Sequence, residues 1–95
     1  MANLLCIAKF IAKPGREEEL HKALLTLLAP TRAEPGCISY ELYQNVENPR
    51  IFTMTECFES KDAFDVHSTQ PYLLHFRETA KNAIESVSLT LGTKL

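Results

Sequence analysis

The sequence predicts an α+β fold, in which helices pack on one face of a single antiparallel sheet. Four segments alternate apolar and polar residues with the period of two that strands show. The regions between them carry apolar residues three and four positions apart, as amphipathic helices do. Turns rich in Pro, Gly and Asn separate the segments. With 95 residues, the chain has the length of one domain, residues 1–95.

The first strand is predicted over residues 3–13. One of its faces carries Leu4, Cys6, Ala8, Phe10 and Ala12, and the other carries Leu5, Ile7, Lys9, Ile11 and Lys13. Because both faces hold apolar side chains, we expect both to become covered in the folded protein. Pro14-Gly15 ends this strand.

A helix follows, from Arg16 to about Arg32. Three glutamates at residues 17–19 crowd its first turn, where the helix dipole favours anions. Its buried stripe consists of Leu20, Ala23, Leu24, Leu27, Leu28 and Thr31. Because Pro30 has no N–H to donate to residue 26, a kink or an early end of the helix is expected there. The segment Glu34-Pro35-Gly36 is the turn that leads out of the helix.

Two strands joined by a turn at Asn48-Pro49 come next. The second strand is predicted over Cys37–Asn45, and the residues that share one of its faces are Ile38, Tyr40 and Leu42. The third strand is predicted over Ile51–Glu59, and its even positions are Phe52, Met54, Glu56 and Phe58.

The C-terminal part is predicted to contain two helices and a strand. Ser60 is a suitable N-cap for a short helix, Lys61–Ser68, and Pro71 opens another helix. The stripe of this other helix is Tyr72, Leu73, Phe76, Ala80, Ala83 and Ile84. The last strand, Ser86–Leu95, has on one side Val87, Leu89 and Leu91. The whole order is βαββαβ, the pattern of a ferredoxin-like antiparallel sheet with helices on one face. Since helices cover only one side, we expect a homodimer joined through the other face of the sheet.

The composition restricts the partners and the compartment. The net charge is −2 and no basic patch is visible, which argues against nucleic-acid binding. The apolar run at residues 4–12 is too short to span a membrane. The three cysteines, Cys6, Cys37 and Cys57, form no CxxC pair, which favours a reducing compartment, the cytoplasm. The spacing of His67 and His75, interrupted by Pro71, does not suit a metal site.

Glu56 and His67 are the candidate catalytic residues. A carboxylate with Phe52, Met54 and Phe58 as same-face neighbours is unfavourable to bury unless it has a use, and burial should raise its pKa toward neutrality. A purely structural carboxylate, tied to a backbone N–H or to a Tyr or His side chain, is the alternative. For His67, the alternatives are a helix C-terminal cap and a base that points into a pocket. The candidate substrate-binding residues are Tyr40, Phe52, Met54, Tyr72 and His75, of which Tyr72 and His75 can share a helix face.

Three stretches resemble the antibiotic-biosynthesis-monooxygenase-like family: KPGREEEL at 13–20, APTRAEPGCISYEL at 29–42 and TECFESKDAFDVH at 55–67. The family includes cofactor-free quinol monooxygenases, and the resemblance implies a dimeric α+β barrel with a pocket between sheet and helices. The positions it carries over are Glu56 and His67. Many relatives have a histidine where this chain has Tyr72, so Tyr72 or the nearby His75 could take its place. Heme-degrading relatives rely on a tryptophan, which this chain lacks.

The resemblance implies a monooxygenase that oxidises a quinol or polyphenol with O2 to a quinone, without a cofactor. Its partners would be a small aromatic substrate, O2 and a second copy of the chain. One alternative is an isomerase of a small phosphorylated carbonyl compound. That enzyme would need a cationic group in the pocket, from Arg32, Arg77 or Lys81. The other alternative is a non-enzymatic module that only binds a small molecule.

Overall fold

The computed structural model describes residues 3–95; residues 1 and 2 of the predicted domain lie outside the described residues. The predicted βαββαβ order is confirmed. The elements are β1 (Leu4–Ala12), α1 (Glu17–Leu25), α2 (Leu28–Arg32), β2 (Cys37–Gln44), β3 (Ile51–Phe58), α3 (Lys61–Ser68), α4 (Pro71–Ala80), a 3₁₀ turn η1 (Lys81–Ala83) and β4 (Ile84–Thr93). None of the helices within residues 3–95 is long and apolar enough to cross a membrane.

The four strands form one sheet in the order β2-β3-β1-β4, and all neighbouring strands are antiparallel. In this ferredoxin-like order the first and third strands occupy the centre. The register pairs Glu56 of β3 with Cys6 of β1 on one side and with Tyr40 of β2 on the other. Directly opposed residues point to the same face, so the three side chains lie together.

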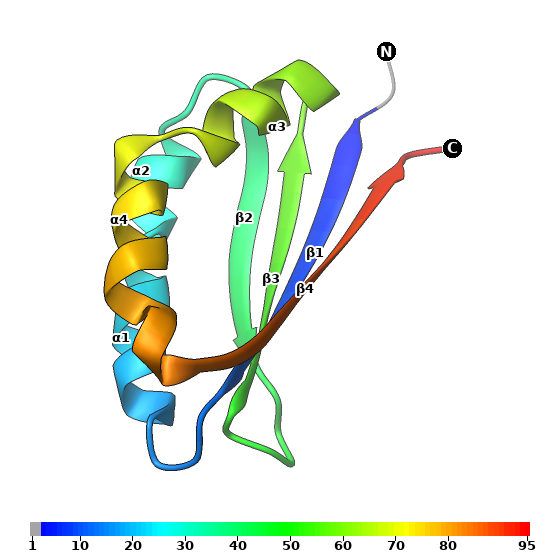
Figure 1. The fold of residues 1–95 in the computed structure, drawn as a ribbon. Helices are drawn as coiled ribbons and strands as arrows, with labels where there is room; N and C mark the ends of the chain where they lie inside the picture. Colours follow the sequence, from blue (N-terminus) through cyan, green and yellow to red (C-terminus); the bar gives the residue numbers. More distant parts are fainter. Residues whose placement is uncertain (1–2) are drawn as a thin grey trace.

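All helices lie on one face of the sheet, with α1 and α4 running along it and α3 crossing its upper end (Figure 1). Of the two apolar faces of β1, the even-numbered one is buried beneath the helices, whereas Leu5 and Ile7 on the other face are exposed. The core between helices and sheet includes Phe10, Leu20, Leu24, Phe52, Met54, Leu73 and Phe76.

The first predicted helix is divided, and the position of the break differs from the prediction. α1 ends at Leu25, and the N–H of Thr26 turns back to the carbonyl of Ala23. Pro30 then lies in the first turn of α2, where its missing N–H has no intrahelical partner to lose. The proline is therefore accommodated by starting a new helix before it rather than by ending one at it.

Two further details differ from the prediction, one within the second strand and one at the start of the last strand. A β-bulge between Cys37 and Ser39 removes Ile38 from the regular alternation, and Ile38 is exposed rather than facing inward with Tyr40. At the other end of the chain, α4 ends at Ala80, and Ile84 is the first residue of β4 instead of the last in a helical stripe.

The last strand leaves part of the helix-facing side uncovered. Val87, Leu89 and Leu91 pair with Phe10, Ala8 and Cys6, so they point to the face that carries the helices. All three are nevertheless exposed, because β4 lies at the edge of the sheet, and its C-terminal end runs away from the helices (Figure 1). An apolar strip therefore lies open next to the helix layer.

Candidate functional site

The candidate site forms where α3 crosses the end of the sheet. Glu56 points inward from β3, as the alternation of that strand predicts, and it is only 5% exposed. His67 comes from the last turn of α3 and is 3% exposed. The inward position of Glu56 and its closeness to His67 are thus both present.

Local contacts hold α3 in this position. The Ser60 hydroxyl caps the helix by accepting a hydrogen bond from the N–H of Ala63 at 3.1 Å, as predicted. Ala63 packs so closely on Gly36 that a Cβ on Gly36 would lie 2.5 Å from the Cβ of Ala63. Glycine at this position lets α3 rest on the turn before β2, and that contact brings His67 next to Glu34.

One imidazole lies between two carboxylates. The Nδ1 atom of His67 is 2.8 Å from Oε2 of Glu34, and its Nε2 atom is 3.7 Å from Oε1 of Glu56. Since a carboxylate accepts hydrogen bonds, the close Glu34 contact assigns the proton to Nδ1. In the neutral ring, Nε2 is then the free acceptor, and it is the atom that faces Glu56.

Tyr72 extends this chain of polar groups on the far side of Glu34. Its hydroxyl donates to the same Oε2 atom of Glu34 and lies 3.4 Å from the carbonyl oxygen of Pro30. Glu34 therefore receives hydrogen bonds from α3 and α4 together. The carboxylate ties the two helices to the turn before β2.

Aromatic rings enclose the imidazole. The ring centroid of His67 lies 5.0 Å from that of Phe58 and 5.6 Å from that of Tyr40. The ring of Phe64 lies 6.3 Å away. These rings fix the orientation of the imidazole and exclude water from its surroundings, which strengthens each electrostatic contact that it makes.

Burial changes the acidity of the groups around the imidazole. Burial, followed by the negative charge of Glu34, raises the pKa of Glu56 to about 7, while a hydrogen bond from Cys6 works in the opposite direction. Burial and the charge of Glu56 raise the pKa of the Cys6 thiol to about 12. The pKa of Tyr72 is raised well above its ordinary value by burial and by its hydrogen bond to Glu34. Near neutral pH, Glu56 can thus gain or lose a proton.

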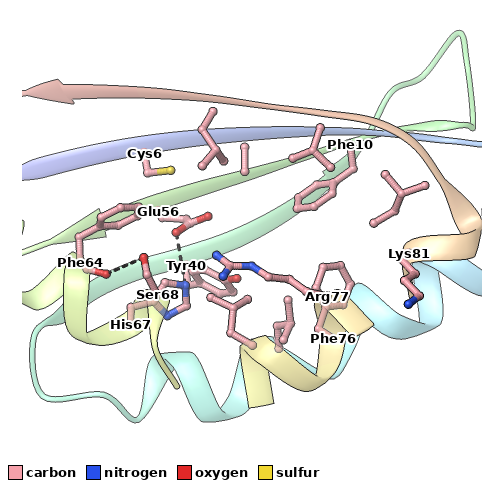
Figure 2. A pocket seen from close by; sticks show the side chains of 16 residues that line it. Cys6, Phe10, Tyr40, Glu56, Phe64, His67, Ser68, Phe76, Arg77 and Lys81 are labelled. Atoms are coloured by element: carbon pink, nitrogen blue, oxygen red, sulfur yellow. Dashed lines mark hydrogen bonds and ion pairs between the residues drawn. The ribbon is translucent and has the colours of Figure 1, made fainter. Parts of the chain in front are cut away.

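A cavity of about 460 Å³ opens beside Glu56 and His67, between the sheet and α3 and α4. Its walls are mostly apolar (Figure 2). The lining residues of the sheet and its approach are Cys6, Ala8, Phe10, Tyr40, Glu56, Ile84, Val87 and Leu89; those of the helical side are Leu27, Phe64, His67, Ser68, Leu73, Phe76, Arg77 and Lys81. This size lies within the range of small-molecule pockets, roughly 300–1,000 Å³.

The other sequence-predicted site residues are distributed differently. Tyr40 lines the cavity. Phe52 and Met54 are buried in the core and do not line it; Phe52 instead stacks on His21. Tyr72 does not line the cavity but reaches Glu34. His75 is exposed and lies outside the cavity, because the buried residues of α4 are Leu73, Phe76 and Ala80.

Glu34 is the polar residue that sequence reasoning missed. The sequence places Glu34 only in a turn, and a turn carries no periodicity that would show where its side chain points. The available signal was its position inside the second resembling stretch, residues 29–42. Arg77 and Lys81 do line the cavity, whereas Arg32 donates to the Tyr40 carbonyl and pairs with Glu41 on the outside.

No group of three or more His, Cys, Asp or Glu side chains in residues 3–95 is placed to hold a metal ion. The chemistry that the described side chains themselves offer is proton transfer. An imidazole nitrogen and a carboxyl group that can exchange a proton near neutral pH face a partly open, mostly apolar cavity.

Comparison with known proteins agrees with this picture. Residues 4–79 match the family described as antibiotic biosynthesis monooxygenase. A Mycobacterium tuberculosis protein named "Putative monooxygenase Rv0793" is 35% identical over 71 residues, which cover 75% of this chain and 69% of that protein. An uncharacterized Synechocystis protein, sll1783, is 33% identical over 72 residues, but the chain spans only 49% of its length. Among solved structures, PA3566 from Pseudomonas aeruginosa matches with a TM-score of 0.96 at 30% identity, over 100% of this chain and 96% of that one. The chain therefore belongs to the antibiotic biosynthesis monooxygenase family.

Proposed function

We propose that the protein is a cofactor-independent monooxygenase that oxidises a quinol or polyphenol with O2 to a quinone. The observation that carries the proposal is the pairing of His67 and Glu56 on the wall of a mostly apolar cavity. A flat aromatic ring fits such a cavity, and its hydroxyl group would meet an imidazole and a carboxylate that can accept its proton. Family membership supports the same class of reaction.

The first step is removal of the hydroxyl proton. Glu34 holds the Nδ1–H of His67, so Nε2 takes the proton from the substrate. The 3.7 Å between Nε2 and Glu56 leaves room for a hydroxyl oxygen within hydrogen-bond distance of both groups. The carboxylates on the two sides of the ring stabilise the positive charge that the imidazole acquires. In this arrangement Glu34 orients the imidazole.

The substrate carries the redox chemistry. The phenolate gives one electron to O2, and the resulting radical and superoxide combine at a ring carbon that bears hydrogen. The peroxide anion takes a proton from the imidazolium. Loss of the ring hydrogen and cleavage of the O–O bond then give the new carbonyl and one water. One oxygen atom of O2 thus enters the quinone and the other leaves as water, while the protein deprotonates, positions and excludes solvent.

We also propose a homodimer and a cytoplasmic location. Leu5 and Ile7 are exposed on the sheet face that no helix covers, and a second copy packed on that face would bury them. The three cysteines are free, as they would be in a reducing compartment. Sedimentation equilibrium of the wild type and of Ile7→Glu measures the dimer, which the added charge should weaken.

The test of the reaction is O2 uptake with menadiol, corrected for autoxidation. The wild type should consume O2 in the presence of EDTA, and His67→Ala should lower kcat/KM by a factor of about 100 or more. With isotopically labelled O2, one labelled oxygen should enter each quinone formed. Labelled hydrogen peroxide with no label in the quinone would contradict oxygenation. His21→Ala is the matched control, because His21 lies outside the cavity.

An isomerase of a small phosphorylated carbonyl compound is the second candidate. The observation that favours it is the presence of Arg77 and Lys81 on the cavity wall, where a phosphate would need a cation. Turnover of a phosphorylated dione without O2 uptake would support it. Retained ligand binding without either activity would support a non-enzymatic binding module.

A further inference from the structure

Arg77 differs from every other arginine in the chain. The four arginines are residues 16, 32, 50 and 77. The first three each pair with a carboxylate: Glu19, Glu41 and Glu85, respectively. The side chain of Arg77 pairs with no carboxylate and makes no hydrogen bond in residues 3–95, and it is the arginine that lines the cavity.

The position of Arg77 follows from the geometry of α4. Leu73, Phe76 and Ala80 are the buried residues of this helix, and Arg77, one turn after Leu73, is exposed at the rim of the cavity. Its side chain extends from α4 across the cavity toward the side where Glu56 and Tyr40 lie (Figure 2). The guanidinium does not neutralise Glu56, whose raised pKa has burial and the charge of Glu34 as its main causes.

The neighbouring cation is arranged differently. Lys81, one turn further along, also borders the cavity, but its ammonium group pairs with Glu78 at 2.9 Å. In Figure 2 the end of its side chain points away from the sheet. Arg77 is therefore the cavity cation whose donors are not engaged by the protein.

An apolar ligand that filled the cavity would leave these exposed donors to water and would gain nothing from them. A ligand with an oxyanion would replace that water with charge-assisted hydrogen bonds, and the planar guanidinium fork suits a carboxylate or phosphate. We infer that Arg77 is a specificity residue, which selects ligands that carry an oxyanion substituent on their apolar ring system. This inference deepens the proposed function, on which it rests, by naming the substrate class.

Binding of three naphthalene compounds tests the inference without any turnover. The probes are 2-naphthol, 2-naphthoate and 2-naphthyl phosphate, which share a ring system and differ in charge. Isothermal titration calorimetry at low ionic strength should show that the wild type binds an anionic compound about 10- to 100-fold more tightly than 2-naphthol. The anion bound more tightly, carboxylate or phosphate, identifies the natural substituent.

Two variants assign the preference to a residue. Arg77→Gln should remove the preference and leave the affinity for 2-naphthol within about threefold of wild type, because Arg77 has no internal partner to lose. Lys81→Gln, the matched control, should retain most of the preference, since the Lys81 ammonium already pairs with Glu78. Circular dichroism of each variant checks that it is folded.

Equal binding of the three compounds by the wild type would overturn the inference, and so would an anion preference that survives in Arg77→Gln. These results are independent of the O2 assay. Anion preference without quinol oxidation would leave the inference standing and remove the proposed function. Quinol oxidation without anion preference would leave the proposed function standing and overturn the inference about Arg77.

Discussion

The two ends of the helix-covered face differ in content although one strand supplies both. Along β3, Phe52 stacks on His21 of α1 and Met54 belongs to the apolar core, while Glu56 on the same side faces His67 of α3. All three are buried to nearly the same extent. The first end is filled by Leu20, Leu24 and other apolar side chains, and the second by an imidazole, two carboxylates and a phenol.

Equal burial therefore contributes to stability with opposite sign at the two ends. At the α1 end, burial of apolar surface stabilises the fold by about 25 cal/mol for each Å² removed from water. At the α3 end, burial raises the pKa of Glu56, which is a measure of the free energy spent on keeping a carboxyl group out of water. A domain of this size tolerates the second end because the first holds the sheet and helices together.

The largest expected effect is at the α1 end. Phe52→Ala should lower the free energy of unfolding by about 3–5 kcal/mol, because Phe52 is fully buried and its removal leaves a cavity. Urea unfolding followed by circular dichroism measures the loss. Since a small domain has roughly 5–15 kcal/mol in total, Phe52→Leu provides a milder second variant.

The activity of each folded molecule is measured alongside the stability of the Phe52 variants. Phe52 does not line the cavity, so Phe52→Leu should keep kcat/KM within about threefold of wild type under conditions where it is folded. A loss of kcat/KM comparable to that of His67→Ala would show that the apolar end also determines activity. It would contradict the division of the helix-covered face into a stabilising end and a reactive end.

The second effect has the opposite sign and depends on pH. Glu56→Gln changes the free energy of unfolding, and this change should be more favourable to the folded state at pH 8 than at pH 4. The difference between the two changes should be about 2–3 kcal/mol. Because the pKa of Glu56 is raised to about 7 in the folded protein, its favourable contribution is complete below the ordinary value of 4.5 and is lost as the pH rises through 7. Glutamine does not ionise and avoids this loss. Urea unfolding of both proteins at the two pH values measures the difference.

The same substitution also tests the role of Glu56 in the proposed reaction. If the ionised form stabilises the imidazolium, wild-type kcat/KM should rise as the pH increases through 7, and this rise should be smaller in Glu56→Gln, where only the base itself has to be unprotonated. A wild-type profile that falls through pH 7 would mean that Glu56 acts in its protonated form. No gain in stability at pH 8 would contradict the unfavourable burial of this carboxyl group.

The sequence predicted the face of each β3 side chain but not its place along the strand. Alternation identified Glu56 as inward-facing, and the fold confirmed it. The same alternation placed Phe52 and Met54 in the site, yet a strand rises about 3.3 Å per residue, so Phe52 lies about 13 Å from Glu56. Periodicity defines a face, whereas a pocket occupies only part of that face.

Glu34 and His75 show a second limit of sequence reasoning. Glu34 reaches His67 only because Gly36 lets α3 approach the turn, a contact between segments that no local pattern records. His75 was placed by its helical spacing from Tyr72, but the side of α4 that packs on the sheet was set by Leu73, Phe76 and Ala80. Contacts that join distant segments decided both outcomes.

The smallest expected effect concerns the outer end of the polar chain. Tyr72→Phe removes one of the two donors to Glu34 and should lower the free energy of unfolding by about 0.5–1.5 kcal/mol. The Nδ1–H of His67 keeps its partner, so its proton resonance should persist in Tyr72→Phe and disappear in Glu34→Ala. kcat/KM should therefore fall much less in Tyr72→Phe than in Glu34→Ala. If the two variants lost activity equally, Tyr72 would share the positioning of the imidazole with Glu34. The polar group of residues that the reaction needs would then include α4 as well as the turn before β2.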